Sequence, residues 1–215
     1  MMALFTQLLL LADGRFPSGG HAHSGGLEAA IVRGRVTDLD DLRAFLRGRL
    51  RTAGLVAAAF AAAACARPDA AEELEEELEA RTPSPALRLA ARRQGRSMGR
   101  ATAVVWPGAP VARVSQPVAL GIAAAAAGLT PPEAAHIAVY HAISGPASAA
   151  VRLLGLDPYA VHALLAELGE ECDAVAREAA RCADGPAADL PAASAPLLDV
   201  SAEDHATWEV RLFAS

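Results

Sequence analysis

The stretch LVAAAFAAAACA, residues 55–66, decides the class of the fold. With the preceding residues it forms an uncharged run of about 15 residues, shorter than the roughly 20 apolar residues that a bilayer span needs. Its alanines allow neighbouring backbones to approach closely, which suits the packing of one helix on another. We therefore expect these residues to form a buried helix in the core of a globular protein.

Helical patterns continue on both sides of this run. Upstream, leucines recur at helical spacing at Leu39, Leu42, Leu46 and Leu50. Downstream, we predict five further helices. They are an acidic helix (70–81), a basic helix (88–100), an alanine-rich helix (118–128), a helix begun by the capping sequence TPPE (130–155) and a last long helix (157–181). Gly54 and the pair Gly145-Pro146 mark places where a helix can break.

The fold class predicted from these patterns is all-α, because no stretch alternates apolar and polar residues with period two. The chain has 215 residues, enough for a single globular helical domain with extended N- and C-terminal segments. We divide it into an N-terminal helix with a glycine-rich loop (1–26), a helical core (27–183) and an extended, loop-like C-terminal tail (184–215).

Composition and charge exclude several classes of function. The net charge of −6 repels nucleic acid unless the basic residues are segregated. The cysteines, Cys65, Cys172 and Cys182, form no C-x-x-C pair, which suggests reduced thiols and a cytoplasmic protein. The apolar N-terminal run lacks a basic flank, so we interpret it as a helix rather than a signal peptide, and we expect no membrane partner.

The loop PSGGHAHSGG, residues 17–26, is the most unusual segment of the chain. A phosphate-binding loop would need a lysine that is absent, and a serine nucleophile at Ser24 beside His23 would need a G-x-S-x-G elbow after a strand. A metal site at His21 and His23 suits nickel or zinc, but two ligands are too few unless a dimer axis doubles them. On residue chemistry alone, a structural role for the glycines and histidines is favoured.

A second unusual feature is a stripe of arginines at i,i+4 spacing, Arg88, Arg92, Arg96 and Arg100. It could dock an acidic partner, but pairing with the neighbouring acidic helix, or a merely solvated face, is the favoured interpretation.

Two long motifs at opposite ends of the chain resemble the UreF family of urease accessory proteins. Residues 8–28 read LLLLADGRFPSGGHAHSGGLE, close to the family pattern LLQLADS-x-LP-x-GGFAHSGGLE. Residues 195–200 read APLLDV, followed by His205 and by RLFAS at 211–215, where the family has APLLDI, a histidine and RLFRS. The chain departs from the pattern at four positions, namely His21 for an aromatic residue, Ala206 for glutamate, Glu209 for tyrosine and Ala214 for arginine.

The resemblance implies an all-α, homodimeric, cytoplasmic protein that is not an enzyme. It implies a chaperone required to mature urease by nickel incorporation, an adaptor between the UreD/UreH accessory protein and the UreG GTPase, with a role in regulating that GTPase. Apo-urease is then the final partner, nickel is handled by the complex, GTP is bound by UreG, and this chain holds no tightly bound cofactor.

We expect the partner contacts at both motifs and the metal contacts, if any, in the loop. The partner-binding candidates are Arg211, Leu212, Phe213, His205, Pro17, Gly19 and Gly20, and the metal candidates are His21 and His23. Arginine and phenylalanine at the tail are the usual composition of interface anchors. The alternatives are a helical interaction module with a different partner and a Ser24/His23 hydrolase.

Overall fold

The computed structural model describes residues 2–110 and 112–214, and this part of the chain contains no β-strand. The all-α fold predicted from the sequence is therefore confirmed. The α-helices are α1 (Met2–Ala12), α2 (Leu27–Val32), α3 (Leu39–Arg49), α4 (Leu55–Ala66), α5 (Ala71–Ala80), α6 (Pro85–Val105), α7 (Gln116–Ala126), α8 (Pro131–Leu154), α9 (Pro158–Glu167), α10 (Gly169–Ala180) and α11 (Pro196–Ala206). Short 3-10 turns lie at η1 (Gly20–Ala22), η3 (Pro68–Ala70) and η4 (Ala187–Asp189), and η2 (Leu50–Gly54) is a π-helical turn.

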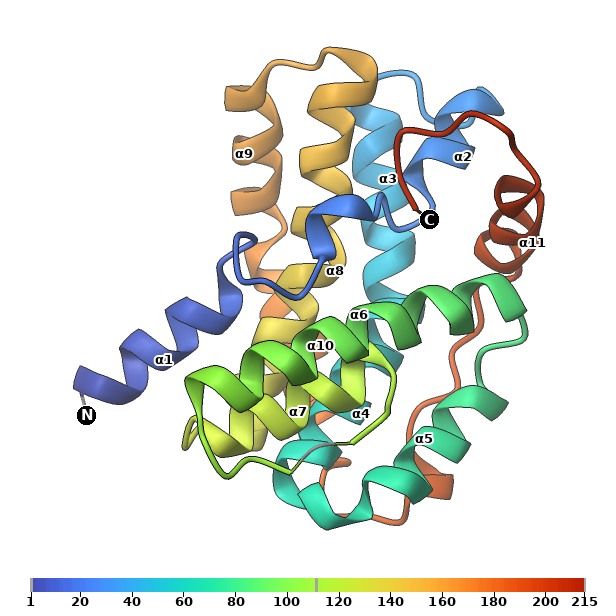
Figure 1. Cartoon of the computed structure of the whole chain (residues 1–215). Coiled ribbons are helices and arrows are strands. Elements are labelled where there is room, and N and C mark those ends of the chain that lie inside the picture. The colour runs from blue at the N-terminus through green and yellow to red at the C-terminus, as the bar shows by residue number, and fades with distance from the viewer. Residues whose placement is uncertain (1, 111, 215) are drawn as a thin grey trace.

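Helix α4 forms the centre of the core, packed between α7, α8 and α10 (Figure 1). Phe60 and the alanines around it are fully buried. The crossing of α4 and α7 depends on Gly121, since a Cβ atom there would lie 2.3 Å from the carbonyl oxygen of Ala61. Small side chains thus bring these two helices close enough to bury one another's backbones.

The predicted break at Gly54 does not occur. Helices α3 and α4 join through the π-turn η2 into one helical stretch, and Gly54 packs there against Ala142 of α8. By length and composition alone, the stretch 39–66 could cross a membrane. However, 67% of its most apolar 18-residue segment is buried inside the protein. It therefore serves as a core helix, as the sequence predicts.

Helix α8 also continues where the sequence marks a possible break. Pro146 has no N–H, so the carbonyl of Ala142, four residues earlier, loses its helical donor. The Nε of Arg49 in α3 donates to that carbonyl at 2.9 Å. A side chain from another helix thus satisfies the orphaned carbonyl, and the helix runs through the proline.

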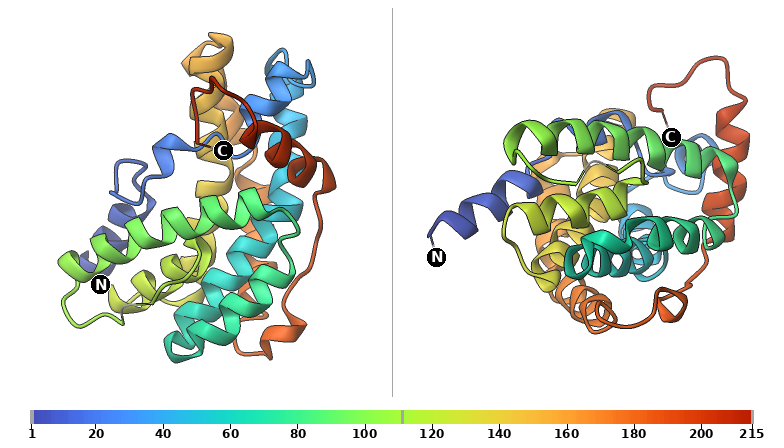
Figure 2. Two further views of the ribbon diagram at one scale, coloured as in Figure 1. Left: turned by 45° about the vertical axis from the view of Figure 1, so that its right-hand side comes forward. Right: turned by 60° about the horizontal axis from the view of Figure 1, so that its bottom comes forward.

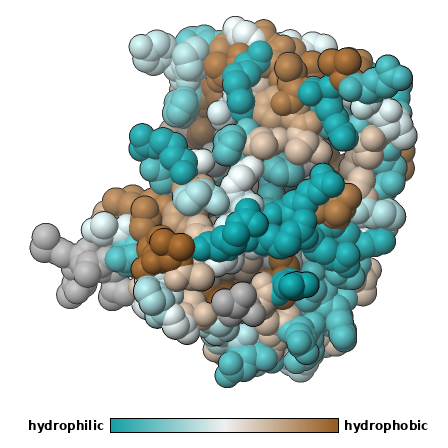
Figure 3. All heavy atoms as spheres, in the orientation of Figure 1, coloured by the Kyte–Doolittle hydropathy of each residue, from teal (hydrophilic) through white to brown (hydrophobic). Residues whose placement is uncertain are grey.

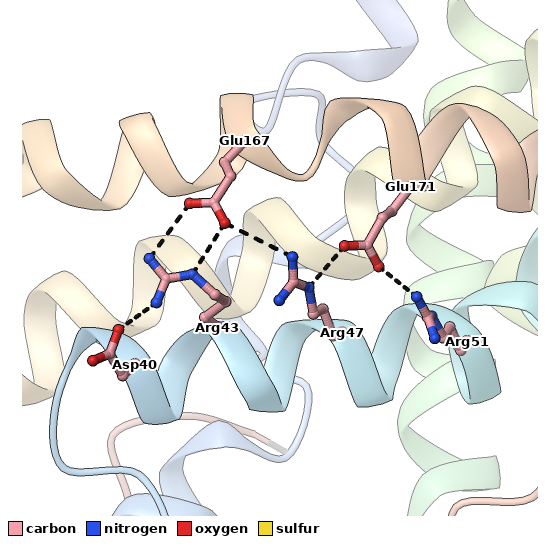
Figure 4. Close-up of polar contacts among 6 residues, drawn as sticks. All are labelled: Asp40, Arg43, Arg47, Arg51, Glu167 and Glu171. Carbon is pink, nitrogen blue, oxygen red and sulfur yellow. Dashed lines mark hydrogen bonds and ion pairs between the residues drawn. The ribbon is translucent and has the colours of Figure 1, made fainter.

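The last long helix predicted from the sequence is two helices, because α9 ends at Glu167 and α10 begins at Gly169, a poor helix former. Both are tied to α3 and η2 by a ladder of ion pairs (Figure 4). Glu167 lies 3.2 Å from Arg43, and Glu171 lies 2.7 Å from Arg47 and 2.9 Å from Arg51. The ladder is partly exposed to solvent, so it fixes the position of the α9–α10 junction on α3 rather than adding much stability.

The prediction that the chain is loop-like from residue 184 onward is wrong for 196–206, which form α11. Its buried face carries Ser201, Ala202 and His205, whereas Leu197 and Val200 are exposed. This inverted pattern hides the apolar periodicity that would reveal a helix. The helix lies against α2 and α6 (Figure 2).

Candidate functional site

The carboxylate of Glu28, at the start of α2, binds the C-terminal tail. Glu28 is 5% exposed, and its Oε2 lies 2.8 Å from the Nε2 of His205. The backbone N–H of Leu212 donates to Oε1 at 2.8 Å, and that of Phe213 donates to Oε2 at 3.1 Å. A buried carboxylate is stable only when its oxygens accept hydrogen bonds, and here all three donors come from residues 205–213. We call Glu28, His205, Leu212 and Phe213 the tail junction.

The glycine-rich loop brings Glu28 to this position. Gly25 and Gly26 have φ angles of +64° and +90°, a conformation that glycine adopts without strain. The turn ends in α2, where the N–H of Glu28 donates to the Oγ of Ser24 at 3.2 Å. A Cβ on Gly26 would lie 2.9 Å from Leu198 of α11, so the loop and the tail helix are in direct contact.

The loop and the tail are also joined beyond Glu28. The N–H of Ala214 donates to the carbonyl of Ala22 at 2.7 Å. Arg152 of α8 lies over the Phe213 ring, 4.6 Å from its centroid, and donates to the carbonyl of His21 at 3.3 Å. The C-terminal end of the chain accordingly lies beside the N-terminal loop in Figure 1. The two sequence motifs, almost 200 residues apart, therefore form a single structural unit.

Arg49 connects this unit to the core. It donates to the carbonyl of Gly25 at 2.8 Å as well as to that of Ala142, and burial lowers its pKa to about 10. A Cβ on Gly25 would lie 3.0 Å from the Arg49 guanidinium carbon. The loop therefore rests on a partly buried cation that donates to two backbone acceptors.

The structure divides the predicted partner-binding residues into two groups. Arg211 and Leu212 are exposed, Leu212 to 76%, and so is Pro17. Phe213 and His205 are 5% and 3% exposed and contact the rest of the chain. The predicted loop glycines, Gly19 and Gly20, are half-buried, and Gly19 has a φ of +80°. One group faces outward, and the other fixes the loop and the tail to the protein.

The predicted metal residues lie in the loop beside the tail. His21 is exposed on η1, and His23 is half-buried. Burial, with the nearby charges of His21 and Arg93, lowers the pKa of His23 to about 4, so its imidazole is neutral at pH 7. Neutral imidazole is the form that binds metals. Within residues 2–110 and 112–214, no three His, Cys, Asp or Glu side chains are grouped to hold an ion.

The hydrolase alternative gains no support from the geometry. Ser24 is fully buried, and its Oγ accepts the N–H of Glu28. A nucleophile needs an open path to its substrate, whereas this hydroxyl is enclosed at the start of α2.

The four departures from the family pattern share one property. His21, Ala206, Glu209 and Ala214 are all exposed. They therefore change the surface that the chain presents without disturbing the tail junction.

The sequence of the chain matches a known protein family and several named relatives. The model of the family described as UreF matches residues 36–169. The chain belongs to the UreF family of urease accessory proteins. Proteins named urease accessory protein UreF from Mycobacterium sp. (strain JLS), Mycobacterium marinum and Mycobacterium tuberculosis are 48%, 45% and 41% identical to it, each over the full length of both chains.

The UreF match and the tail junction cover different parts of the chain. The family model spans the helices from Val36 to Gly169, whereas the junction joins the segments before and after it. Sequence reasoning missed Glu28, Arg49 and Arg152 as residues of this site. Glu28 is the last residue of the N-terminal motif, so its position there was the available signal, but nothing in the sequence pairs it with the tail.

Proposed function

We propose that this UreF-family chain is an adaptor in the maturation of urease, joining the UreD/UreH accessory protein to the UreG GTPase during nickel insertion into apo-urease. Its membership of the UreF family supports a role in urease maturation. The observation that carries the adaptor role is the tail junction, which builds one ordered surface from two distant ends of the chain.

The surface beside the junction has the composition of a binding site. Arg211 and Leu212 project from the tail, and Val210 next to them is 86% exposed. Three hydrogen bonds to Glu28 fix the backbone beneath these side chains. Ordering a segment before binding lowers the entropy that association costs, so a fixed tail favours affinity for a partner. We assign Arg211 and Leu212 to direct partner contact, and Phe213 and His205 to holding the tail.

The proposal assigns the chemistry to the partners. GTP is bound by UreG, whose hydrolysis the adaptor regulates, and the chain is not itself an enzyme. Nickel passes near His21 and His23, and the neutral imidazole of His23 suits transient binding. The complex is cytoplasmic and built on a homodimer of this chain, which would bring a second pair of loop histidines into the assembly.

The test is urease maturation in a heterologous host that expresses the cognate urease and its other accessory proteins. Active, nickel-loaded urease should appear only when this chain is present. The double variant Arg211→Ala/Leu212→Ala should lower urease activity and binding to UreD/UreH or UreG by roughly tenfold or more, because arginine is a frequent interface anchor and a leucine buried on binding adds apolar contact. A matched control, Arg177→Ala/Tyr159→Ala, removes an exposed arginine and an exposed large apolar side chain on α10 and α9, outside both motifs.

Two outcomes would contradict the proposal. Urease that matures equally well without the chain would favour the alternative of a helical module with a different partner. Unchanged binding by the Arg211/Leu212 variant would show that the tail is not the contact surface. Nickel titration of the wild type and of His21→Ala/His23→Ala tests the metal path separately, and equal binding by both would leave the histidines structural.

A further inference from the structure

Helix α6 carries a concentration of positive charge that the tail junction does not use. The helix contains five arginines and no acidic residue, on a chain whose net charge is −6. All 19 basic residues of the chain are arginines. Helix α6 therefore carries a net positive charge on a molecule whose net charge is negative.

The first two arginines of α6, Arg88 and Arg92, make contacts within the chain. Arg92 pairs with Glu79 and lies 3.8 Å from Glu75, both on α5. Arg88 donates to the carbonyl of Pro83 at 2.9 Å. The pairing with the acidic helix predicted from the sequence is therefore confirmed for Arg92.

The last three arginines of α6 face solvent. Residues four positions apart on an α-helix are offset by about 40° around its axis. The arginines of the predicted stripe therefore do not all lie on one face of α6. Arg93, Arg96 and Arg100 are exposed, and none of them pairs with a carboxylate among residues 2–110 and 112–214. Arg100 donates only to the hydroxyl of Ser97 within its own helix.

Apolar side chains continue this row of arginines at both ends. Leu89 is 47% exposed and Val104 is 80% exposed. Together with the three arginines they fall within an arc of about 80° and span about 22 Å along the helix axis. We call these five residues, Leu89, Arg93, Arg96, Arg100 and Val104, the α6 strip. Figure 3 shows a hydrophilic band along α6 that ends in a hydrophobic area at the C-terminal end of the helix.

The α6 strip lies next to the glycine-rich loop. The charge of Arg93 contributes to the lowered pKa of His23. A Cβ on Gly19 would lie 3.9 Å from the hydroxyl of Ser97, and Phe16 packs against Trp106 just beyond the end of α6, with ring centroids 6.2 Å apart. A protein bound at the loop would therefore reach the strip as well.

We propose that the α6 strip is a docking surface for an acidic segment of a protein partner. The argument is charge complementarity: guanidinium groups without carboxylate partners recognise carboxylates through paired hydrogen bonds, and Leu89 and Val104 add apolar contact at the two ends. A nucleic acid is disfavoured by the net charge of the chain and by the absence of an aromatic residue in the strip on which bases could stack. This inference does not depend on the proposed function.

The test compares two fluorescent peptides of identical composition. In the matched peptide, a helical sequence carries three glutamates spaced to meet the three arginines, with leucine near each end; in the scrambled peptide, that spacing is destroyed. Fluorescence anisotropy should give at least about tenfold tighter binding of the matched peptide to the wild type. Charge reversal by Arg96→Glu/Arg100→Glu should abolish this preference, and Arg96→Gln/Arg100→Gln should do the same with less disturbance of folding.

The matched control is Arg177→Glu/Arg181→Glu, which reverses two exposed arginines at the same i,i+4 spacing on another face of the protein. It should keep the preference for the matched peptide. Equal binding of the matched and scrambled peptides, or a preference that survives in both strip variants, would overturn the proposal. Tighter binding of a single-stranded oligonucleotide of equal charge to the same arginines would overturn it in favour of a nucleic acid.

Discussion

The alanine-rich core and the tail junction hold parts of the molecule together in opposite ways. Around α4, helices pack through small apolar side chains, and contact at Gly121 brings backbone against backbone. At the junction, the carboxylate of Glu28 accepts directional hydrogen bonds from three groups of the tail. Apolar packing in the core is shared among many residues, whereas the position of the tail depends on a few hydrogen bonds. We infer that the core sets global stability and that the junction sets local order at the surface.

The largest effect should come from adding one methyl group to the core. In Gly121→Ala, the new Cβ would lie 2.3 Å from the carbonyl oxygen of Ala61, so α4 and α7 must separate. We expect a loss of about 3 kcal/mol in the free energy of unfolding, the upper range for overpacking. Urea denaturation measures it.

The same substitution at Gly48 is the control for this prediction. Gly48 lies in α3 with nothing within 4 Å of a Cβ, so alanine should stabilise the helix by up to about 1 kcal/mol. Equal effects at the two glycines would contradict the close packing of α4 and α7.

A second prediction tests the link between the two regions. Arg49→Ala leaves the carbonyls of Gly25 and Ala142 without their donor and should cost about 2 kcal/mol. Pro146→Ala restores the N–H that the Ala142 carbonyl lacks. In a double-mutant cycle, Arg49→Ala should therefore cost less in the Pro146→Ala background by about 1 kcal/mol. Additive effects would show that Arg49 does not compensate for the proline.

A smaller effect should follow from pH at the loop. The pKa of His23 is about 4 in the folded protein against an ordinary value of 6.5, so the unfolded chain binds the proton first. Stability should therefore fall as the pH decreases from 6.5 towards 4. In His23→Asn this part of the pH dependence should be weaker, as measured by thermal unfolding across that range.

The sequence predicts the core better than the junction for a physical reason. Helical spacing and capping residues are local signals, so the leucines of α3 and the TPPE start of α8 identify their helices. The exceptions are places where a distant group intervenes. Arg49 donates to the carbonyl of Ala142, which allows α8 to continue past Pro146. The buried face of α11 is partly polar, so its sequence shows no apolar period.

The tail junction has no local signal of this kind. Glu28 is separated from His205 by 177 positions and from Phe213 by 185, and no periodicity relates them. The resemblance to the UreF family singles out both motifs without indicating that they touch. Likewise, the sequence identifies Phe213 as a candidate contact, but its burial under Arg152 follows only from the fold.

The most direct test of the tail junction is amide hydrogen exchange at Leu212 and Phe213 in the wild type and in Glu28→Ala. Both amides donate to Glu28, so they should be protected in the wild type and exchange freely in the variant. The amides of α4 should stay protected in both proteins, and Glu76→Ala, which removes an exposed carboxylate on α5, should match the wild type. Rapid exchange of Leu212 and Phe213 in the wild type, or unchanged protection in Glu28→Ala, would contradict the account.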